Sequence, residues 1–446
     1  MRKLLFVSLG CDKNLVDSER MLAALLKHGY EMTDDESEAE VIIINTCCFI
    51  HDAQDESVEN ILAMAEYKKS GSCRALIVTG CMAQMFGKDI LDELPEVDAV
   101  LGTGDFDKII EAADRAFEGV RMTETGNRDS LPVGMQDRVS VTGGFSEYLK
   151  IAEGCDKHCT YCVIPHLRGN YRSVPMEELV AEAEKLAESG VTELNLVAQE
   201  TTVYGKDLYG EKSLHILLKK LAAIDGIKWI RILYCYPEEI YPELIDTIAS
   251  EPKICRYLDL PIQHCNDEIL KRMGRRTSRE GLLDIIAKLR AAMPDIALRT
   301  SLITGFPGET KEQHEELKRF VEDVRFDRLG VFTYSREDGT PAASMPGQID
   351  EDVKSSRREE IMLLQQKISA EKGREKIGSE TEVFIEGYMP EDGTYIGRTR
   401  SDAPSVDGYI FIETEREFRT GDIVSCVITG ANEYDLTGEI RYESAE

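Results

Sequence analysis

Three cysteines lie close together near the middle of the chain, at Cys155, Cys159 and Cys162. They fall within eight residues of sequence, too short a segment for them to cross-link to one another without strain. Thiolates gathered in one loop are the usual ligands of a shared metal ion or an iron–sulfur cluster, and three ligands leave one iron of a cluster open to a substrate. The alternative is a structural zinc site with His158 or His166 as fourth ligand, although the spacing lacks the second CxxC or HxxxH half that such sites need.

A second set of three cysteines is spread over the N-terminal part of the chain. Cys11, Cys47 and Cys81 each come directly after a short apolar run that predicts a buried strand. Because the carboxyl ends of parallel strands share one edge of an open α/β sheet, the three thiols should converge. The alternative is that they are small buried residues at tight turns, as free cysteines often are. We interpret Cys48 and Cys73 as bystanders, although the pattern alone does not separate Cys48 from its neighbour.

The N-terminal elements that must position these thiols alternate between strands and helices. The predicted strands are Lys3–Ser8, Val41–Asn45, Ala75–Thr79 and Ala99–Leu101. A first helix is predicted from Asn14, as its N-cap, to Lys27. This alternation predicts a doubly wound parallel sheet over residues 1–125. A further helix and a polar connector with the composition of a linker follow over residues 105–140.

A second alternation of strands and helices begins at about Phe145. The predicted strands are Tyr148–Ala152, Glu193–Ala198, Trp229–Tyr234, Tyr257–Leu260, Ala297–Thr304 and Leu329–Tyr334, and the clearest helices are Met176–Glu188 and Ser278–Ala292. Six such units predict a partial (β/α) barrel, in which ligands bind at the carboxyl ends of the strands.

Polar segments follow several strands of this predicted barrel. The central cysteines follow the first strand, Gln199–Thr202 the second, Pro261–His264 the fourth and Gly305–Glu309 the fifth. The two glycines of the last segment would let the backbone approach a ligand and offer its amides as hydrogen-bond donors. Taken alone, that glycine pair is more often an ordinary turn, and a lone His264 is more often structural than catalytic.

The C-terminal part is predicted to be a long charged helix followed by a small β-barrel. In the helix, Asp350–Lys376, the residues expected to cover the partial barrel are Ile361, Leu363, Leu364 and Ile368. From Glu380 onward, short alternating runs punctuated by Gly and Pro predict a small antiparallel β-barrel.

The charge of the chain bears on its partners. The chain has 53 basic and 83 acidic residues, a net charge of −30, and from Glu380 onward 16 acidic residues face 5 basic ones, a net of −11. A surface that binds the phosphate backbone tightly would normally be basic. We therefore expect no tight RNA binding by the C-terminal barrel and a basic protein as partner. The alternative is that the acidity only serves solubility.

The expected compartment is the cytoplasm. No apolar run approaches the length of a membrane span, and the N-terminus leads straight into a strand pattern rather than a signal peptide. Twelve cysteines without an export signal point to a reducing compartment, where clustered thiols are metal ligands rather than disulfides.

Several segments resemble one family of enzymes. CxxxCxxC followed by Ile-Pro resembles the cluster loop of radical S-adenosylmethionine (SAM) enzymes, and the whole chain resembles the methylthiotransferases among them. Within that family, the segments Ser8–Glu19 (SLGCDKNLVDSE), Asn45–Ile50 (NTCCFI) and Leu196–Gly205 (LVAQETTVYG) resemble the RimO branch, which modifies a ribosomal protein. The branch that modifies transfer RNA tends instead to carry a Gly-Cys-Gln-Met-Asn type of segment.

The resemblance implies site residues. Cys155, Cys159 and Cys162 would hold a SAM-cleaving 4Fe–4S cluster and be catalytic, whereas Cys11, Cys47 and Cys81 would hold an auxiliary 4Fe–4S cluster that delivers sulfur. It favours Cys47 over Cys48 as ligand. The implied SAM contacts are Tyr161, Gln199, Gln263, Ile303, Gly305 and Gly308.

The resemblance also implies domains: a methylthiotransferase N-terminal domain (1–125), a radical SAM core with its linker helix (141–376) and a TRAM domain (379–446) that recruits substrate. Because the radical site would lie in the core, deleting the chain from Glu380 onward is expected to leave SAM cleavage nearly intact.

The implied reaction is the addition of a methylthio group to the β-carbon of an aspartate in the basic twelfth small-subunit ribosomal protein, free or in the ribosome. An electron donor such as flavodoxin or ferredoxin would be needed, and no membrane is implied. The alternatives are a tRNA adenosine methylthiotransferase and a non-catalytic, metal-cluster-containing protein that binds the ribosome.

Overall fold

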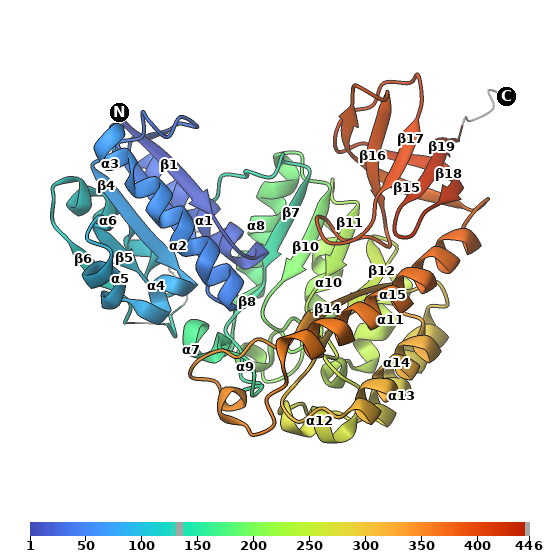
Figure 1. Ribbon diagram of the computed structural model, residues 1–446. Coiled ribbons are helices and arrows are strands. Elements are labelled where there is room, and N and C mark those ends of the chain that lie inside the picture. Colours follow the sequence, from blue (N-terminus) through green and yellow to red (C-terminus); the bar gives the residue numbers. More distant parts are fainter. Residues whose placement is uncertain (127, 131–136, 442–446) are drawn as a thin grey trace.

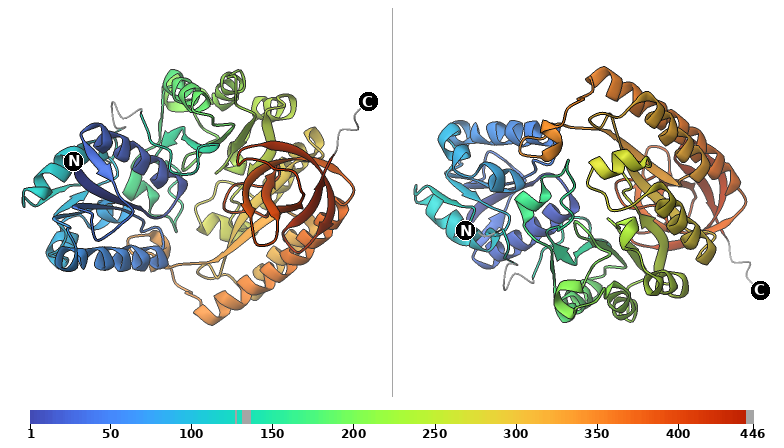
Figure 2. Two further views of the ribbon diagram at one scale, coloured as in Figure 1. Left: turned by 90° about the horizontal axis from the view of Figure 1, so that it is seen from above. Right: turned by 90° about the horizontal axis from the view of Figure 1, so that it is seen from below.

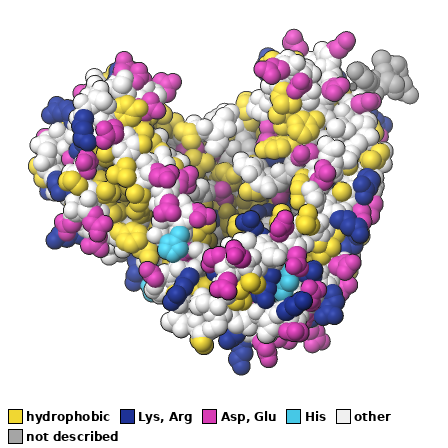
Figure 3. Space-filling view, in the orientation of Figure 1, with side chains coloured by type: hydrophobic (Ala, Val, Ile, Leu, Met, Phe, Trp, Pro, Cys, Tyr) yellow, Lys and Arg dark blue, Asp and Glu magenta, His cyan; other side chains and the backbone are white. Residues whose placement is uncertain are grey.

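The computed structural model describes residues 1–126, 128–130 and 137–441 (Figure 1). It confirms the predicted fold class: an N-terminal parallel sheet, a central open parallel sheet with helices, and a small closed barrel at the C-terminal end. Part of the predicted linker, residues 127 and 131–136, lies outside the described residues. No helix in the described part of the chain has the length and apolar character needed to cross a membrane. The surface is hollowed between the N-terminal sheet domain and the C-terminal barrel (Figure 3).

The N-terminal sheet is parallel throughout, with the strand order β2-β1-β3-β4-β5-β6. Its strands are β1 (Arg2–Ser8), β2 (Tyr30–Met32), β3 (Val41–Thr46), β4 (Ala75–Gly80), β5 (Ala99–Leu101) and β6 (Met122–Glu124). Its helices are α1 (Asp12–Lys27), α2 (His51–Ala65), α3 (Tyr67–Ser70), α4 (Cys81–Phe86), α5 (Lys88–Glu93) and α6 (Ile109–Phe117). Alternate residues of the central strands pack into two separate apolar cores, one on each face, as a doubly wound sheet requires.

The start of α1 differs from the prediction. The helix begins at Asp12 and its N-cap is Cys11, whereas Asn14 lies inside the first turn. The Asn14 amide donates hydrogen bonds to the carbonyl oxygens of Leu9 (3.1 Å) and Thr46 (3.0 Å). The side chain that resembled a cap therefore ties the ends of β1 and β3 together.

The central sheet is open and parallel, with the strand order β14-β13-β12-β11-β10-β7. Its strands are β7 (Ser146–Lys150), β10 (Glu193–Val197), β11 (Trp229–Ile232), β12 (Ile254–Asp259), β13 (Ala297–Thr304) and β14 (Arg328–Thr333); β8 (Ala152–Glu153) and β9 (Arg172–Ser173) form a separate pair. The helices are α7 (Ile164–Arg168), α8 (Met176–Glu188), α9 (Lys206–Tyr209), α10 (Leu214–Ala222), α11 (Pro242–Ser250), α12 (Asp267–Arg272), α13 (Arg279–Ala292) and α14 (Lys311–Val324).

The long helix α15 (Glu351–Glu375) packs against β14 and α14 and reaches β18 of the C-terminal barrel (Figure 2). Ile361 and Ile368 are buried in the central core, and Leu364 packs partly against it. The prediction for Leu363 is wrong, because that side chain is 60% exposed. A residue two positions after Ile361 points to another side of the helix.

The C-terminal barrel consists of β15 (Glu380–Met389), β16 (Thr394–Thr399), β17 (Ile410–Glu413), β18 (Ile423–Ala431) and β19 (Leu436–Ile440). The sequence did not reveal β19. The barrel is also not wholly antiparallel as predicted, because β17 and β19 pair in parallel to close it.

The C-terminal barrel covers the inner face of the central sheet. Trp229 and Phe384 are in ring contact, with centroids 5.9 Å apart, and the Tyr257 hydroxyl donates to Asp407 (2.7 Å). The fully buried Glu193 binds Arg398 from the barrel at 2.5 Å. The residues from Glu380 onward thus contribute to the packing of the central domain, and the near-intact SAM cleavage expected after their deletion stays a prediction. Their removal would expose this aromatic surface to water and leave Glu193 without Arg398.

We expect Arg398→Met to lower the free energy of unfolding by about 3–5 kcal/mol, because it removes one partner of a buried ion pair. Burial raises the pKa of Glu193, but Arg398 and Arg231 lower it to about 2 from an ordinary value of 4.5. The pairing therefore stabilises the fold fully above pH 4.5 and is lost as the pH falls towards 2.

Denaturant unfolding between pH 7 and pH 3 measures this effect. The difference between wild type and Arg398→Met should shrink as the pH falls, whereas Arg416→Met, on the exposed surface of the same barrel, should match wild type at each pH. A difference that is independent of pH would contradict the assignment of the stability to this ion pair.

Candidate active site

The three N-terminal cysteines follow three strands that are neighbours in the sheet. In the register of that sheet, Ser8 lies opposite Asn45, and Asn45 lies opposite Thr79. The structure thus brings Cys11, Cys47 and Cys81 to one edge, as the strand pattern predicted. Burial raises the pKa of the Cys81 thiol to about 11; Arg168 lowers it, and the nearby Cys11 and Cys47 raise it again.

Gly10 permits the close approach of two of these loops. Its φ of +89° is a left-handed conformation that glycine adopts without strain. A Cβ at this position would lie 2.8 Å from Cys47 Cβ and 3.1 Å from Cys47 Sγ. Any side chain there would push the Cys11 loop away from Cys47.

Cys47 and Cys48 have different surroundings. The Cys47 backbone N–H donates to Ser57 Oγ (3.1 Å), and that hydroxyl donates back to the Cys47 carbonyl oxygen (2.8 Å). Cys48 is fully buried within the apolar core, and its Sγ lies 3.8 Å from Met85 Sδ. These contacts hold Cys47 at the edge shared with Cys11, whereas Cys48 lies in the apolar core that also includes Cys81.

The central cysteine loop follows β8 and is fixed by its backbone. Cys155 N–H donates to the carbonyl oxygen of Gly169 (3.1 Å), and Thr160 N–H donates to that of Met273 (2.9 Å). Cys155 and Cys159 are buried and Cys162 is partly exposed. Burial, and to a lesser degree the nearby Cys159, raise the pKa of Cys155 to about 12, although a hydrogen bond from the Lys157 backbone lowers it. The thiols therefore lie close enough to disfavour one another's ionisation, an arrangement that a bound cation would relieve.

The two histidines proposed as zinc ligands, His158 and His166, are both exposed. Within the described ranges, no group of three or more His, Cys, Asp or Glu side chains is placed to hold a single metal ion. A 4Fe–4S cluster makes a different demand, because each thiolate binds a different iron atom. Two sets of three free thiols, each on one edge or in one loop, fit that requirement in donor type and number.

The predicted SAM contacts lie around the carboxyl ends of the central strands. The Tyr161 ring packs edge-on against Phe306, with centroids 6.4 Å apart. Gln199 donates through Nε2 to Glu153 Oε1 (2.8 Å), while its own Oε1 is buried without a hydrogen-bond partner. Gln263, with a φ of +68°, accepts a hydrogen bond from Ile303 N–H (2.8 Å).

The expectation that Gly305 and Gly308 offer their amides to a ligand is wrong. Gly305 N–H donates to the buried carboxylate of Glu309, and Gly308 N–H donates to the carbonyl oxygen of Gly347 (2.7 Å). Glu309 also accepts from Phe306 N–H (3.2 Å) and pairs with Arg357 of α15 (3.3 Å). Glu309 therefore fixes the shape of this loop from inside and ties it to α15.

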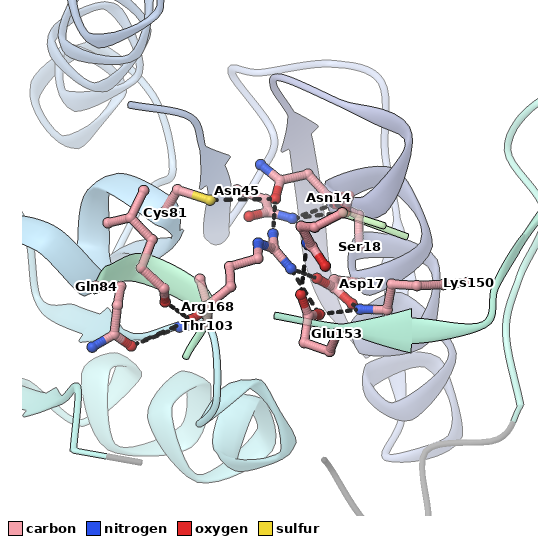
Figure 4. A network of polar contacts seen from close by, with 12 residues as sticks. Asn14, Asp17, Ser18, Asn45, Cys81, Gln84, Thr103, Lys150, Glu153 and Arg168 are labelled. Carbon is pink, nitrogen blue, oxygen red and sulfur yellow. Dashed lines mark hydrogen bonds and ion pairs between the residues drawn. The ribbon is translucent and has the colours of Figure 1, made fainter. Parts of the chain in front are cut away.

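A buried ion network joins the two cysteine sites, and sequence reasoning missed it (Figure 4). Arg168, on α7 after the central loop, binds Asp17 of α1 at 3.1 Å and Glu153 at 2.9 Å, and it donates to Asn14 Oδ1. Lys150 completes the network by binding the same two carboxylates. Two cations thus balance two carboxylates in a region where the side chains are at most 6% exposed.

The network reaches both sites. The Asn14 Oδ1 atom lies 3.9 Å from Cys81 Sγ at the N-terminal edge. Glu153 directly precedes the Gly154–Cys155 turn of the central loop and holds Gln199. The arrangement of one cysteine site is therefore mechanically linked to that of the other. The signal in the sequence was weak: charged residues within the otherwise apolar face of α1, and an arginine six residues after Cys162.

Comparisons with known proteins cover the whole chain. Residues 3–102 match the uncharacterized protein family UPF0004, residues 149–321 the radical SAM superfamily and residues 377–440 the TRAM domain. The chain is 61% identical to the ribosomal protein uS12 methylthiotransferase RimO of Lachnoclostridium phytofermentans, over 98% of this chain and 99% of that protein. It is 49% identical to the enzyme of the same name from Geobacter sulfurreducens, over 98% of each chain.

Solved structures share the fold. The radical SAM methyltransferase TsrM from Kitasatospora setae, with cobalamin and a [4Fe-4S] cluster bound, superposes with a TM-score of 0.57 at 16% identity, over 89% of this chain and 80% of that one. The cobalamin-dependent radical SAM enzyme OxsB gives a TM-score of 0.51 at 12% identity, over 82% of this chain and 56% of that one.

Proposed function

The chain belongs to the RimO family of ribosomal protein uS12 methylthiotransferases, and from this premise we propose that it adds a methylthio group to the β-carbon of an aspartate in uS12. It is a radical SAM enzyme, with SAM and iron–sulfur clusters as cofactors. The observation that carries the proposal is the pair of three-cysteine sites joined by the buried network around Arg168.

The residue assignments are those that the family resemblance implies, and the convergence of each set of three thiols supports them. Cys155, Cys159 and Cys162 hold the cluster that binds SAM, and the N-terminal edge holds the auxiliary cluster through Cys11, Cys47 and Cys81. When bound, the first cluster supplies the electron that cleaves SAM, and the second supplies the sulfur atom. The chain's own residues position these groups and line the space where SAM binds. The proposed SAM contacts remain Tyr161, Gln199, Gln263, Ile303, Gly305 and Gly308, the last two through loop shape rather than free amides.

The remaining proposals concern organisation and partners. The functional units are residues 1–125, 141–376 and 379–446, and the last presents an acidic barrel to the basic ribosomal protein, free or in the ribosome. An electron donor such as flavodoxin or ferredoxin reduces the enzyme in the cytoplasm. The acidic barrel disfavours the alternative of a transfer RNA substrate. The buried network that links both cysteine sites gives no support to a non-catalytic binding protein.

Substrate choice is tested by incubating the reconstituted enzyme with dithionite and with SAM labelled in its methyl group. Purified uS12 is the substrate in one reaction and total tRNA in the other. We expect label in uS12, at an aspartate, and none in tRNA above a control without enzyme. Label in an adenosine of tRNA but not in uS12 would contradict the proposal.

We predict that Cys47, not Cys48, is the auxiliary ligand. Cys47→Ala should lose methylthiolation of uS12 and about half of the bound iron, because one of two clusters loses a ligand. Cys48→Ala, the matched control one residue away, should keep both. Iron per chain and methylthiolated uS12 are measured side by side, and the opposite pattern would reverse the assignment.

A further inference from the structure

Lys13 is a buried cation without a carboxylate partner. The residue is only 6% exposed, and its Nζ lies 3.2 Å from the centroid of the Tyr234 ring. Among the described residues, no carboxylate lies within ion-pair distance of this ammonium. The neighbouring Asp12 instead accepts a hydrogen bond from the Tyr234 hydroxyl (2.9 Å). Tyr234, Cys11 and Asp12 attract this ammonium without forming a direct ion pair with it, so Lys13 keeps the capacity to bind a further anion.

The other buried lysines of the described residues show what a structural lysine looks like here. Lys150 binds Asp17 and Glu153, and Lys354 binds Glu351 (2.6 Å) and the carbonyl oxygen of Tyr334 (2.9 Å). Both are matched by acidic groups of the protein itself. Lys13 differs from them because it has no direct ion pair with a described carboxylate, although the chain contains 83 acidic residues.

Lys13 lies between the auxiliary cysteines and the central sheet. It is two residues after Cys11 in the first turn of α1, and Tyr234 follows the carboxyl end of β11. Tyr234 is held rigidly, because its N–H donates to Asp259 (3.1 Å) and its carbonyl oxygen accepts from Thr201 N–H (3.1 Å). The ring therefore fixes one side of the ammonium and leaves its other donors for a ligand.

The N-terminus of α1 favours a negative charge at the same place. The helix is 16 residues long, and its N-cap, Cys11, makes no side-chain capping hydrogen bond. The backbone N–H groups and the dipole of a helix attract anions at such an end, and Asp12, the acidic residue of this first turn, accepts a hydrogen bond from the Tyr234 hydroxyl. Two features, an ammonium without a direct ion pair and a helix N-terminus without a side-chain cap, thus favour an anionic ligand at one place.

We propose that Lys13 binds the side-chain carboxylate of the substrate aspartate and so selects it. The inference rests on the proposed function. A carboxylate held by Lys13 places the β-carbon, which is bonded to that carboxylate carbon, beside the auxiliary site and facing the central sheet. Lys13 thereby fixes which carbon is presented to the sulfur source, and a neutral amide at the same position lacks the charge that the ammonium pairs with.

The test measures equilibrium binding to the reconstituted enzyme without reductant, so that no turnover occurs. Wild type, Lys13→Met and Lys13→Arg are each titrated with purified uS12 and with uS12 in which the target aspartate is replaced by asparagine. Lys27→Met, the same substitution at the exposed far end of α1, is the matched control. Iron per chain and the affinity for SAM are measured for every variant.

Wild type and Lys27→Met should bind the aspartate form about tenfold more tightly than the asparagine form. Lys13→Met should bind both forms equally, and Lys13→Arg should retain part of the preference, since it keeps the charge with another geometry. A preference that survives in Lys13→Met overturns the inference, as does a wild type without preference. Should Lys13→Met lower iron content or SAM affinity, the inference stands only if Lys13→Arg, with wild-type iron, shows the reduced preference.

A failure of the proposed function can be distinguished from a failure of the role proposed for Lys13. If wild type does not methylthiolate uS12 with reductant and SAM, the function is wrong. If it does, and Lys13→Met still distinguishes aspartate from asparagine, only the role of Lys13 is wrong.

Discussion

Replacing Cys155, Cys159 and Cys162 together by alanine should abolish SAM cleavage and leave about half of the iron, because the N-terminal edge keeps its own three thiols. The two sites lie on different sheets and share no ligand, although the ion network around Arg168 links them. Iron and sulfide per chain, and 5′-deoxyadenosine released with dithionite, measure the two effects.

The control for this prediction is a set of buried cysteines outside both sites. Cys235, Cys255 and Cys265 lie in the apolar interior of the central domain. Cys255→Ala should keep the iron content and SAM cleavage of wild type. Complete loss of iron in the triple variant, or zinc in the anaerobically reconstituted wild type, would contradict the two-cluster account.

Arg168→Met should lower the free energy of unfolding by about 3–5 kcal/mol, because Asp17 and Glu153 would stay buried with Lys150 as their remaining cation. The variant should also lose iron from the N-terminal site, since Asn14, which Arg168 holds, lies against Cys81. Denaturant unfolding and iron content measure the two consequences.

A double-mutant cycle separates the network from general damage. Asp17→Asn combined with Arg168→Met should cost less than the sum of the two single changes, because the first change removes the charge that the second leaves unpaired. Additive costs would show that Arg168 and Asp17 do not act together. Arg168→Lys should recover part of the stability but not the contact with Asn14.

Local pattern and strand topology were enough to predict the edge position of the N-terminal thiols. Cys11, Cys47 and Cys81 each come after a buried strand, and parallel strands end together. The ends of α8 were also predicted correctly, as Met176–Glu188. The prediction that Asn14 caps α1 was wrong. Its side-chain amide instead donates hydrogen bonds to backbone carbonyl oxygens at the ends of two strands.

Contacts between distant segments were beyond local pattern. Arg168 and Asp17 are 151 positions apart, and Glu193 and Arg398 are 205 apart. The sequence position of a charged residue does not predict which distant residue it will pair with in the folded protein. For the same reason the sequence did not show that side chains of the C-terminal barrel pack on the inner face of the central sheet.

The most direct test of the central claim is mass spectrometry of uS12 and of tRNA from cells with and without this gene. The account predicts that an aspartate of uS12 carries a methylthio group only in cells that have the gene, while the methylthiolated adenosines of tRNA are unchanged. Loss of tRNA methylthiolation with uS12 unaffected would contradict it.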